Sequence, residues 1–178
     1  MQKKLLYYGF NEERREKVVN VAEKFGIKTK EVKREDLEQK VAVLFNLEGY
    51  EREDVDYVEV PETEMLLFGE FDRTILQSYL MELKEKDVIV PHKAVITETS
   101  KDWKFSYLVE HIQEEHKVVQ MFNELGKLTK IAQKKLDTVK DVELIEAVDY
   151  ALSIREINGV EMEDIMPRYN RLKEALNG

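Results

Sequence analysis

The sequence predicts an α+β fold in which one β–turn–α unit occurs twice and a helical tail follows. Residues 5–11 and 66–72 each contain a short apolar run, a glycine, a phenylalanine and then a helix-capping residue, Asn11 or Asp72. In the second copy Glu70 is inserted at the turn, between the glycine and the phenylalanine. Beyond about residue 117 the strand patterns end and apolar residues recur at helical spacing. A repeated unit of this kind indicates a pseudo-symmetric domain.

The character of the predicted strands suggests how the sheet is ordered. The opening strands, 4–9 and 65–69, are apolar throughout, whereas the strand around 28–32 is largely polar. Continuously apolar strands are typical of a sheet centre and mixed strands of an edge. We therefore predict a ferredoxin-like split βαβ sandwich, with the two opening strands adjacent and parallel at the centre and helices on one face. A flavodoxin-like parallel sheet is the alternative.

The helices of the two units align with each other. The first helix begins after Asn11 and ends near Gly26, with its apolar stripe at Val18, Ala22 and Phe25. The second begins after Asp72, with its stripe at Leu76, Tyr79, Leu80 and Leu83. A shift of 61 positions superimposes Asn11 on Asp72, Val18 on Tyr79 and Ala22 on Leu83. Further helices are predicted at 35–46 and 101–116, as insertions on the ferredoxin-like plan.

The connection between the two units is acidic. Residues 48–64 hold eight acidic residues, and Arg52 is the one basic residue among them. Val55, Tyr57 and Pro61 suggest an extended backbone. We interpret this segment as a solvated loop.

The helical tail sets the predicted domain boundary: an α+β repeat domain over 1–116 and a helical tail over 117–178. Gly126 is expected to kink the first tail helix. The helix over 141–157 carries apolar residues on two adjoining faces, and so broad a surface needs two neighbours. A homodimer and a closed three-helix monomer both satisfy this requirement.

Composition excludes several classes of function. A net charge of −9 disfavours binding along a nucleic-acid backbone. The absence of cysteine excludes disulfides and thiol chemistry. No apolar run approaches the roughly 20 residues that cross a bilayer, and the run after Lys4 is too short for a signal peptide. We expect a cytoplasmic protein that binds neither nucleic acid nor membrane.

No catalytic residues, metal site or cofactor are predicted, because the nucleotide and hydrolase motifs are absent and three histidines are too sparse. The candidate ligand site is the strand–helix junction, where hydroxyls, an ammonium and helix N–H groups can hold an oxyanion. Its residues are Thr97, Thr99, Ser100, Lys101 and Trp103. In the structural interpretation, Thr99 and Asp102 form a capping box and Trp103 is a packing anchor.

The same junction carries a resemblance. The run from Lys93 to Trp103, preceded by residues 66–69 and followed by Glu114-Glu115-His116, resembles a bacterial family of uncharacterised proteins found in anaerobic Firmicutes and Fusobacteria. That family has an "AV-T--N-W" junction and a terminal "EEH". The resemblance covers roughly residues 1–116. It implies no activity and no site residues.

Two functions from different classes follow. The first is an interaction or scaffold protein that self-associates, or binds another protein, through its helical tail; the missing catalytic motifs favour this non-enzymatic role. The second is a sensor of a small anionic metabolite, or an enzyme acting on one, with its site at Thr97–Trp103.

Overall fold

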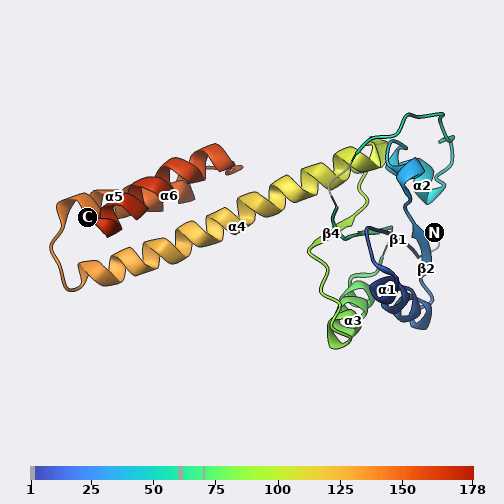
Figure 1. The fold of residues 1–178 in the computed structure, drawn as a ribbon, viewed down its shortest axis with the longest axis horizontal. Coiled ribbons are helices and arrows are strands. Elements are labelled where there is room, and N and C mark those ends of the chain that lie inside the picture. Colours follow the sequence, from blue (N-terminus) through green and yellow to red (C-terminus); the bar gives the residue numbers. More distant parts are fainter. Residues whose placement is uncertain (1–2, 60–61, 70) are drawn as a thin grey trace. The chain divides into compact units, whose positions relative to one another are not determined.

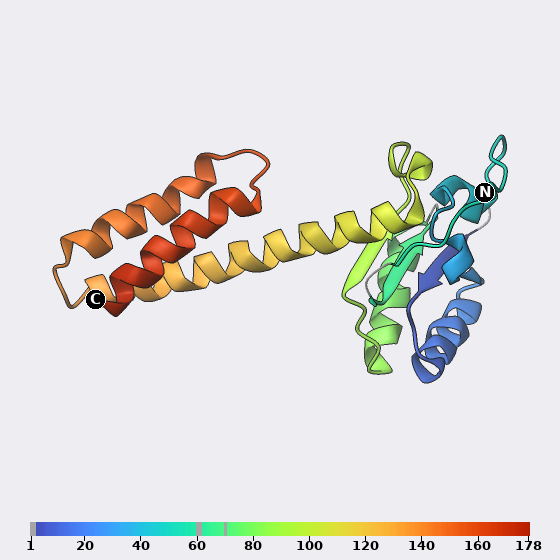
Figure 2. The ribbon, with the colours of Figure 1, turned by 45° about the horizontal axis from the view of Figure 1, so that its top comes forward.

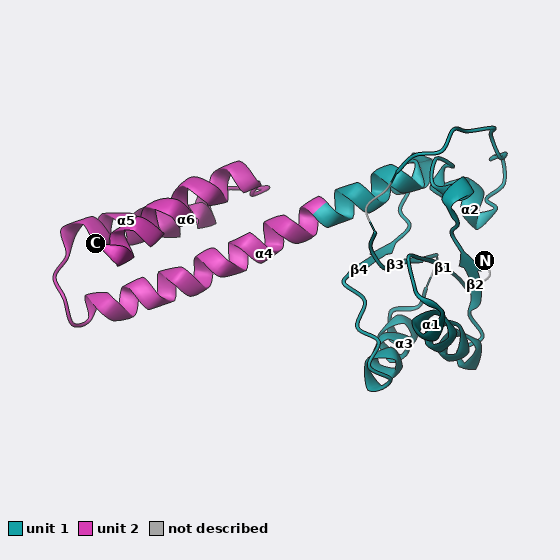
Figure 3. Ribbon diagram, in the orientation of Figure 1, with its two compact units in different colours: residues 1–113 teal, residues 114–178 magenta. Residues whose placement is uncertain are grey.

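The structure is a computed structural model that describes residues 3–59, 62–69 and 71–178. Pro61 and the inserted Glu70 lie outside the described residues. The chain divides into two compact units, residues 1–113 and 114–178 (Figure 3). They are called unit 1 and unit 2 below.

Unit 1 is built on one four-stranded mixed sheet. Its strands are β1 (Lys4–Tyr8), β2 (Lys28–Glu31), β3 (Met65–Phe68) and β4 (His92–Val95), in the order β2-β1-β3-β4. β1 is parallel to β2, and β3 is parallel to β4. β1 and β3 are antiparallel, with Leu6 opposite Leu67.

The sheet confirms one part of the predicted topology and corrects another. The opening strands are adjacent and central, as their apolar sequences predicted. They are antiparallel, however, so the predicted parallel pair is wrong, and so is the all-parallel alternative. Each opening strand also pairs directly with the second strand of its own unit, which differs from a split βαβ arrangement. An apolar run reports that a strand is buried on both faces, and burial does not depend on strand direction.

Two helices, α1 (Glu12–Lys24) and α3 (Arg73–Glu85), cover one face of the sheet (Figure 1). The predicted caps are confirmed: the Asn11 side chain accepts from the Arg14 N–H at 2.9 Å, and the Asp72 side chain accepts from the Thr74 N–H at 2.8 Å. The core under these helices contains Leu5, Tyr7, Val18, Val21, Ala22, Leu66, Phe68, Tyr79 and Leu83.

The opposite face is covered by the short helix α2 (Val41–Phe45) and the first turns of α4 (Phe105–Leu136). Helices therefore lie on both faces of the sheet. Two 3₁₀ turns precede them, η1 (Arg34–Asp36) and η2 (Ser100–Asp102). The predicted helix at 35–46 is thus a 3₁₀ turn plus one short helix. The helix predicted from residue 101 begins at Phe105 and continues without a break through Gly126.

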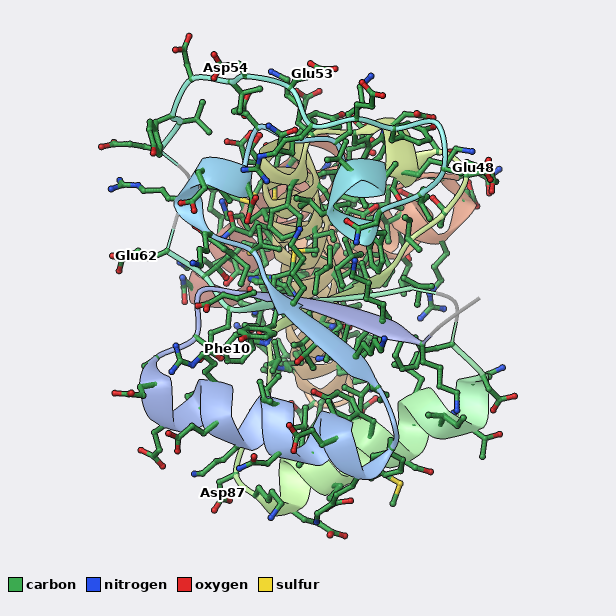
Figure 4. The ribbon with its side chains drawn as sticks, turned by 90° about the vertical axis from the view of Figure 1, so that its right-hand side faces the viewer. Phe10, Glu48, Glu53, Asp54, Glu62 and Asp87 are labelled. Atoms are coloured by element: carbon green, nitrogen blue, oxygen red, sulfur yellow. The ribbon has the colours of Figure 1, made fainter. Side chains whose placement is uncertain are left out.

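The acidic connection between α2 and β3 is a loop in its described part. No strand is assigned to residues 48–59 or 62–64. Glu48, Glu53, Asp54 and Glu62 are exposed, and Figure 4 shows their carboxylates directed away from the body of the unit. These four residues lie in solvent, as the charge of the segment predicted.

Unit 2 is a three-helix assembly of the later part of α4, α5 (Val142–Leu152) and α6 (Met162–Asn177), with η3 (Ser153–Glu156) after α5. Figure 2 shows the three helices side by side. Its core contains Leu125, Ala132, Leu144, Ala147, Val148, Ala151, Ile154, Ile165 and Leu172. The two apolar faces of α5 are thus partly buried against the other helices of the same chain. Among the described residues, no helix is long and apolar enough to span a bilayer.

Candidate ligand-binding cavity

A cavity of about 910 Å³ lies at one end of the sheet in unit 1. The antiparallel contact between β1 and β3 creates this end: β1 and β2 begin here, whereas β3 and β4 finish here. The loop after α2 and the loop after β4 supply the remaining walls. The cavity's apolar wall consists of Phe45, Leu47 and Ile96.

Four lysines line this cavity. Lys4 comes from the start of β1, Lys28 and Lys30 from β2, and Lys101 from η2. Lys28 and Lys30 are two positions apart, so they stand on the same face of their strand. Neither forms an ion pair with any residue that the structure describes. Two acidic residues, Glu48 and Glu98, are also among the lining residues.

Lys4 and Lys101 have different surroundings. The Lys4 Nζ donates to the Leu44 carbonyl at 2.8 Å and lies 5.8 Å from the centre of the Phe45 ring. Partial burial, and then the charge of Lys30, lower the pKa of Lys4. The Lys101 Nζ instead lies 2.5 Å from the Glu98 carboxylate, and this hydrogen bond raises the pKa of Lys101.

A hydrogen bond joins the two loops that border the cavity. The Tyr50 hydroxyl, in the loop after α2, donates to the Asp102 carboxylate at 2.6 Å. That bond raises the pKa of Tyr50. Because Asp102 is in η2, beside Lys101, the bond holds the two loops together at the rim.

Gly69 allows close packing in the cavity wall. Its N–H donates to the Lys4 carbonyl at 2.9 Å, which extends the β1–β3 ladder by one residue. A Cβ at this position would lie 3.1 Å from both the Lys4 carbonyl oxygen and the Phe45 ring. A larger residue would therefore push on the Lys4 main chain and on the Phe45 ring, which lies beside the Lys4 side chain.

The structure places only part of the predicted junction in the cavity. Thr97 and Lys101 line it, whereas Thr99, Ser100 and Trp103 are not among its lining residues. Ser100 is buried, and Trp103 packs edge-on against Tyr107 and His111, with ring centres 5.0 and 5.1 Å away.

The local cap also differs from the one predicted. Thr97 and Ser100 bond reciprocally: the Ser100 N–H donates to Thr97 Oγ1 at 3.0 Å, and the Thr97 N–H donates to Ser100 Oγ at 2.9 Å. No side-chain cap is made by Thr99. Asp102, the other half of the predicted box, accepts from Tyr50 instead.

The N–H groups expected to hold an anion are already bonded to the protein. The Lys101 N–H donates to the Thr97 carbonyl, and the Trp103 N–H to Ser100. At the start of α4, the N–H groups of Phe105 and Ser106 donate to carbonyls in the 37–39 segment. Any anion site here therefore depends on side chains, because neighbouring carbonyls occupy the helix end.

Sequence reasoning missed Lys4, Lys28 and Lys30. The detectable signal was the pair of lysines at alternate positions in a short polar strand, since that spacing places both on one face. Their proximity to Lys101 around the cavity depends on the direction of β3 relative to β1, which the sequence did not reveal.

A second cavity, of about 700 Å³, lies at the opposite end of the sheet. It is lined by the residues after β1, including Phe10, and by those before β3 and β4, including Glu62 and Glu64. Phe10 and Glu62 are labelled in Figure 4. No lysine is among its lining residues, and Glu64 is paired with Arg14. The two ends of the sheet thus differ in charge. Among the described residues, no group of three or more metal-ligating side chains is found.

Comparison with known proteins gives one match. Residues 64–119 match the model of a family described as "Domain of unknown function (DUF3783)". This confirms the likeness of a segment to an uncharacterised domain. The matched span runs from the residue before β3 into α4, so it includes Thr97 and Lys101 but not Lys4, Lys28 or Lys30. No curated protein and no solved structure matches the chain.

Proposed function

We propose that unit 1 binds a small anionic molecule in the lysine-lined cavity. The observation that carries this proposal is the gathering of four lysines around one cavity in a chain of net charge −9. The proposal keeps the predicted Thr97 and Lys101 as ligand-binding residues. It also assumes the cytoplasmic location that the sequence predicts.

Electrostatics supports the proposal. Partial burial is the first cause of the lowered pKa of Lys4, and the neighbouring charge of Lys30 is the second. An anion in the cavity relieves the repulsion between these two ammonium groups. Phe45, Leu47 and Ile96 offer contact to a carbon skeleton, so the combination suits an organic acid or a phosphorylated metabolite.

Thermal unfolding with a panel of anions tests this function, because a ligand that binds the native state raises the melting temperature. The panel contains inorganic phosphate, citrate, pyruvate and adenosine monophosphate. At least one should stabilise the wild type, and Lys28→Gln with Lys30→Gln should abolish the shift. The control is Lys84→Gln with Lys86→Gln, which makes the same charge change on exposed residues of α3 and its C-cap. The proposal is contradicted if no anion stabilises the wild type. It is also contradicted if the control variant loses the anion-induced shift to the same extent as Lys28→Gln with Lys30→Gln.

Self-association through unit 2 is the second proposal. Leu144 and Ile154 are buried in the unit's own core, so they cannot form an interface between copies. Val142 and Ile145, one turn apart on α5, are 70% and 44% exposed and favour a contact with a second chain. The closed monomer is the alternative.

Light scattering tests the self-association. It should show a dimer for the wild type and a folded monomer for Val142→Glu with Ile145→Glu. A monomeric wild type contradicts this proposal.

A further inference from the structure

The geometry points to Lys4 as an amine that forms an imine with an anionic carbonyl compound, an α-keto or aldehyde acid, inside the lysine-lined cavity. This inference rests on the proposed anion binding and adds a chemical class of ligand to it. Lys28, Lys30 and Lys101 would attract the carboxylate, and Lys4 would react with the carbonyl carbon.

The position of Lys4 suits a reactive amine. Its backbone is fixed at the start of a central strand, where its carbonyl accepts from the Gly69 N–H. Its Nζ is directed by the Leu44 carbonyl and lies beside the Phe45 ring. A neutral amine can still donate to that carbonyl, through a weaker bond than the one made by the ammonium.

The surroundings of Lys4 favour its neutral amine more than the surroundings of Lys101 favour the neutral amine there. Burial and Lys30 both disfavour its charged form, and no carboxylate of the described residues forms an ion pair with it. Lys101, in contrast, is held in the charged form by Glu98. Partial desolvation and a neighbouring cation are the two features that activate amines for imine formation in enzymes.

The reaction balances without an oxidant or reductant. The Lys4 ammonium gives one proton to water, and the neutral amine attacks the carbonyl carbon to form a carbinolamine. The C–O bond then breaks, and the departing hydroxide takes up the released proton. In total, one ammonium and one carbonyl compound give one protonated imine and one water.

Reductive trapping tests the inference in the full chain. Pyruvate or glyoxylate is added with sodium cyanoborohydride at neutral pH, and labelled lysines are identified by peptide mass spectrometry. We expect Lys4 to gain the ligand's carbon skeleton several times faster than Lys84. The label at that position should be lost in Lys4→Arg, which keeps the charge, and should persist in the matched variant Lys86→Arg, at an exposed position outside the cavity.

Two results would overturn the inference: labelling of Lys4 no faster than that of Lys84, or labelling equally fast after unfolding in urea. The melting temperature separates this failure from that of the proposed function. If pyruvate stabilises the wild type but Lys4 is not selectively labelled, anion binding stands and the imine is rejected. If no anion stabilises the wild type, the function proposed for the cavity is rejected as well.

Discussion

The hydroxyl of Tyr79 donates to the main-chain carbonyl of Val18 at 3.2 Å, and the two residues occupy the same position in α3 and α1. Tyr79 follows its cap residue Asp72 by as many residues as Val18 follows Asn11. Helices related by a two-fold axis meet at equivalent positions. The contact therefore supports the proposal that unit 1 contains two copies of one β–α–β unit.

Removing this hydroxyl should destabilise unit 1. Tyr79 is fully buried, and burial raises the pKa of its hydroxyl, which stays a donor at neutral pH. Tyr79→Phe keeps the edge-on ring contacts with Phe25 and Phe68 but loses the hydrogen bond. We expect the free energy of unfolding to fall by about 1 kcal/mol in urea titrations. Tyr107→Phe, at a half-exposed position, is the control and should change it little.

Gly69→Ala should both destabilise unit 1 and disturb the cavity. The new methyl group would lie 3.1 Å from the Lys4 carbonyl oxygen and from the Phe45 ring. Overpacking of this kind costs about 1–3 kcal/mol. Urea titration measures the loss, and anion-induced stabilisation should weaken in the same variant. If the alanine changes neither the free energy of unfolding nor the anion-induced stabilisation, the cavity wall accommodates the methyl group and the prediction is wrong.

Gly126→Ala should stabilise unit 2, whereas Gly69→Ala destabilises unit 1. Gly126 lies inside α4, and an added Cβ would meet nothing within 4 Å outside the helix's own backbone. Alanine is a better helix former than glycine by about 1 kcal/mol. The melting temperature of unit 2 should therefore rise. A lower value would mean that the helix needs glycine at this point.

The sequence predicted the sheet centre and the caps of α1 and α3, but it predicted neither the cavity nor the cap at η2. Apolar runs such as Leu5-Leu6 identify buried strands, and Asn11 and Asp72 identify helix starts, because these signals are local. The direction of β3 relative to β1 depends on distant contacts. Had the two strands been parallel, Lys4 and Thr97 would lie at opposite ends of the sheet. Their actual proximity follows from the antiparallel pair.

Acid should weaken the contact that joins the start of α4 to the 37–39 segment. The Glu38 carboxylate accepts from the Lys104 ammonium and the Ser106 hydroxyl, each at 2.5 Å, and these bonds lower the pKa of Glu38. A carboxyl with a lowered pKa in the folded state stabilises the protein above its ordinary pKa. That stabilisation disappears as the pH falls through the folded-state value.

The variant Glu38→Gln tests this dependence. It should be less stable than the wild type at neutral pH, and the difference should shrink between about pH 5 and pH 3. Glu110→Gln makes the same charge change at an exposed position of α4 and serves as the control. A constant difference across the whole range would show that the Glu38 charge does not contribute.

The last prediction concerns whether the two units unfold separately. Leu144 is fully buried in the core of unit 2, whereas its neighbour Ile145 is 44% exposed. Leu144→Ala should destabilise unit 2 by about 2–5 kcal/mol, and Ile145→Ala should cost much less. The single tryptophan, Trp103, belongs to unit 1, so its fluorescence reports that unit, whereas circular dichroism reports the helices of both. In Leu144→Ala, part of the dichroism signal should melt at a lower temperature while the fluorescence transition stays in place. If both transitions shift together, α4 couples the two units into one cooperative structure, and their independence is refuted.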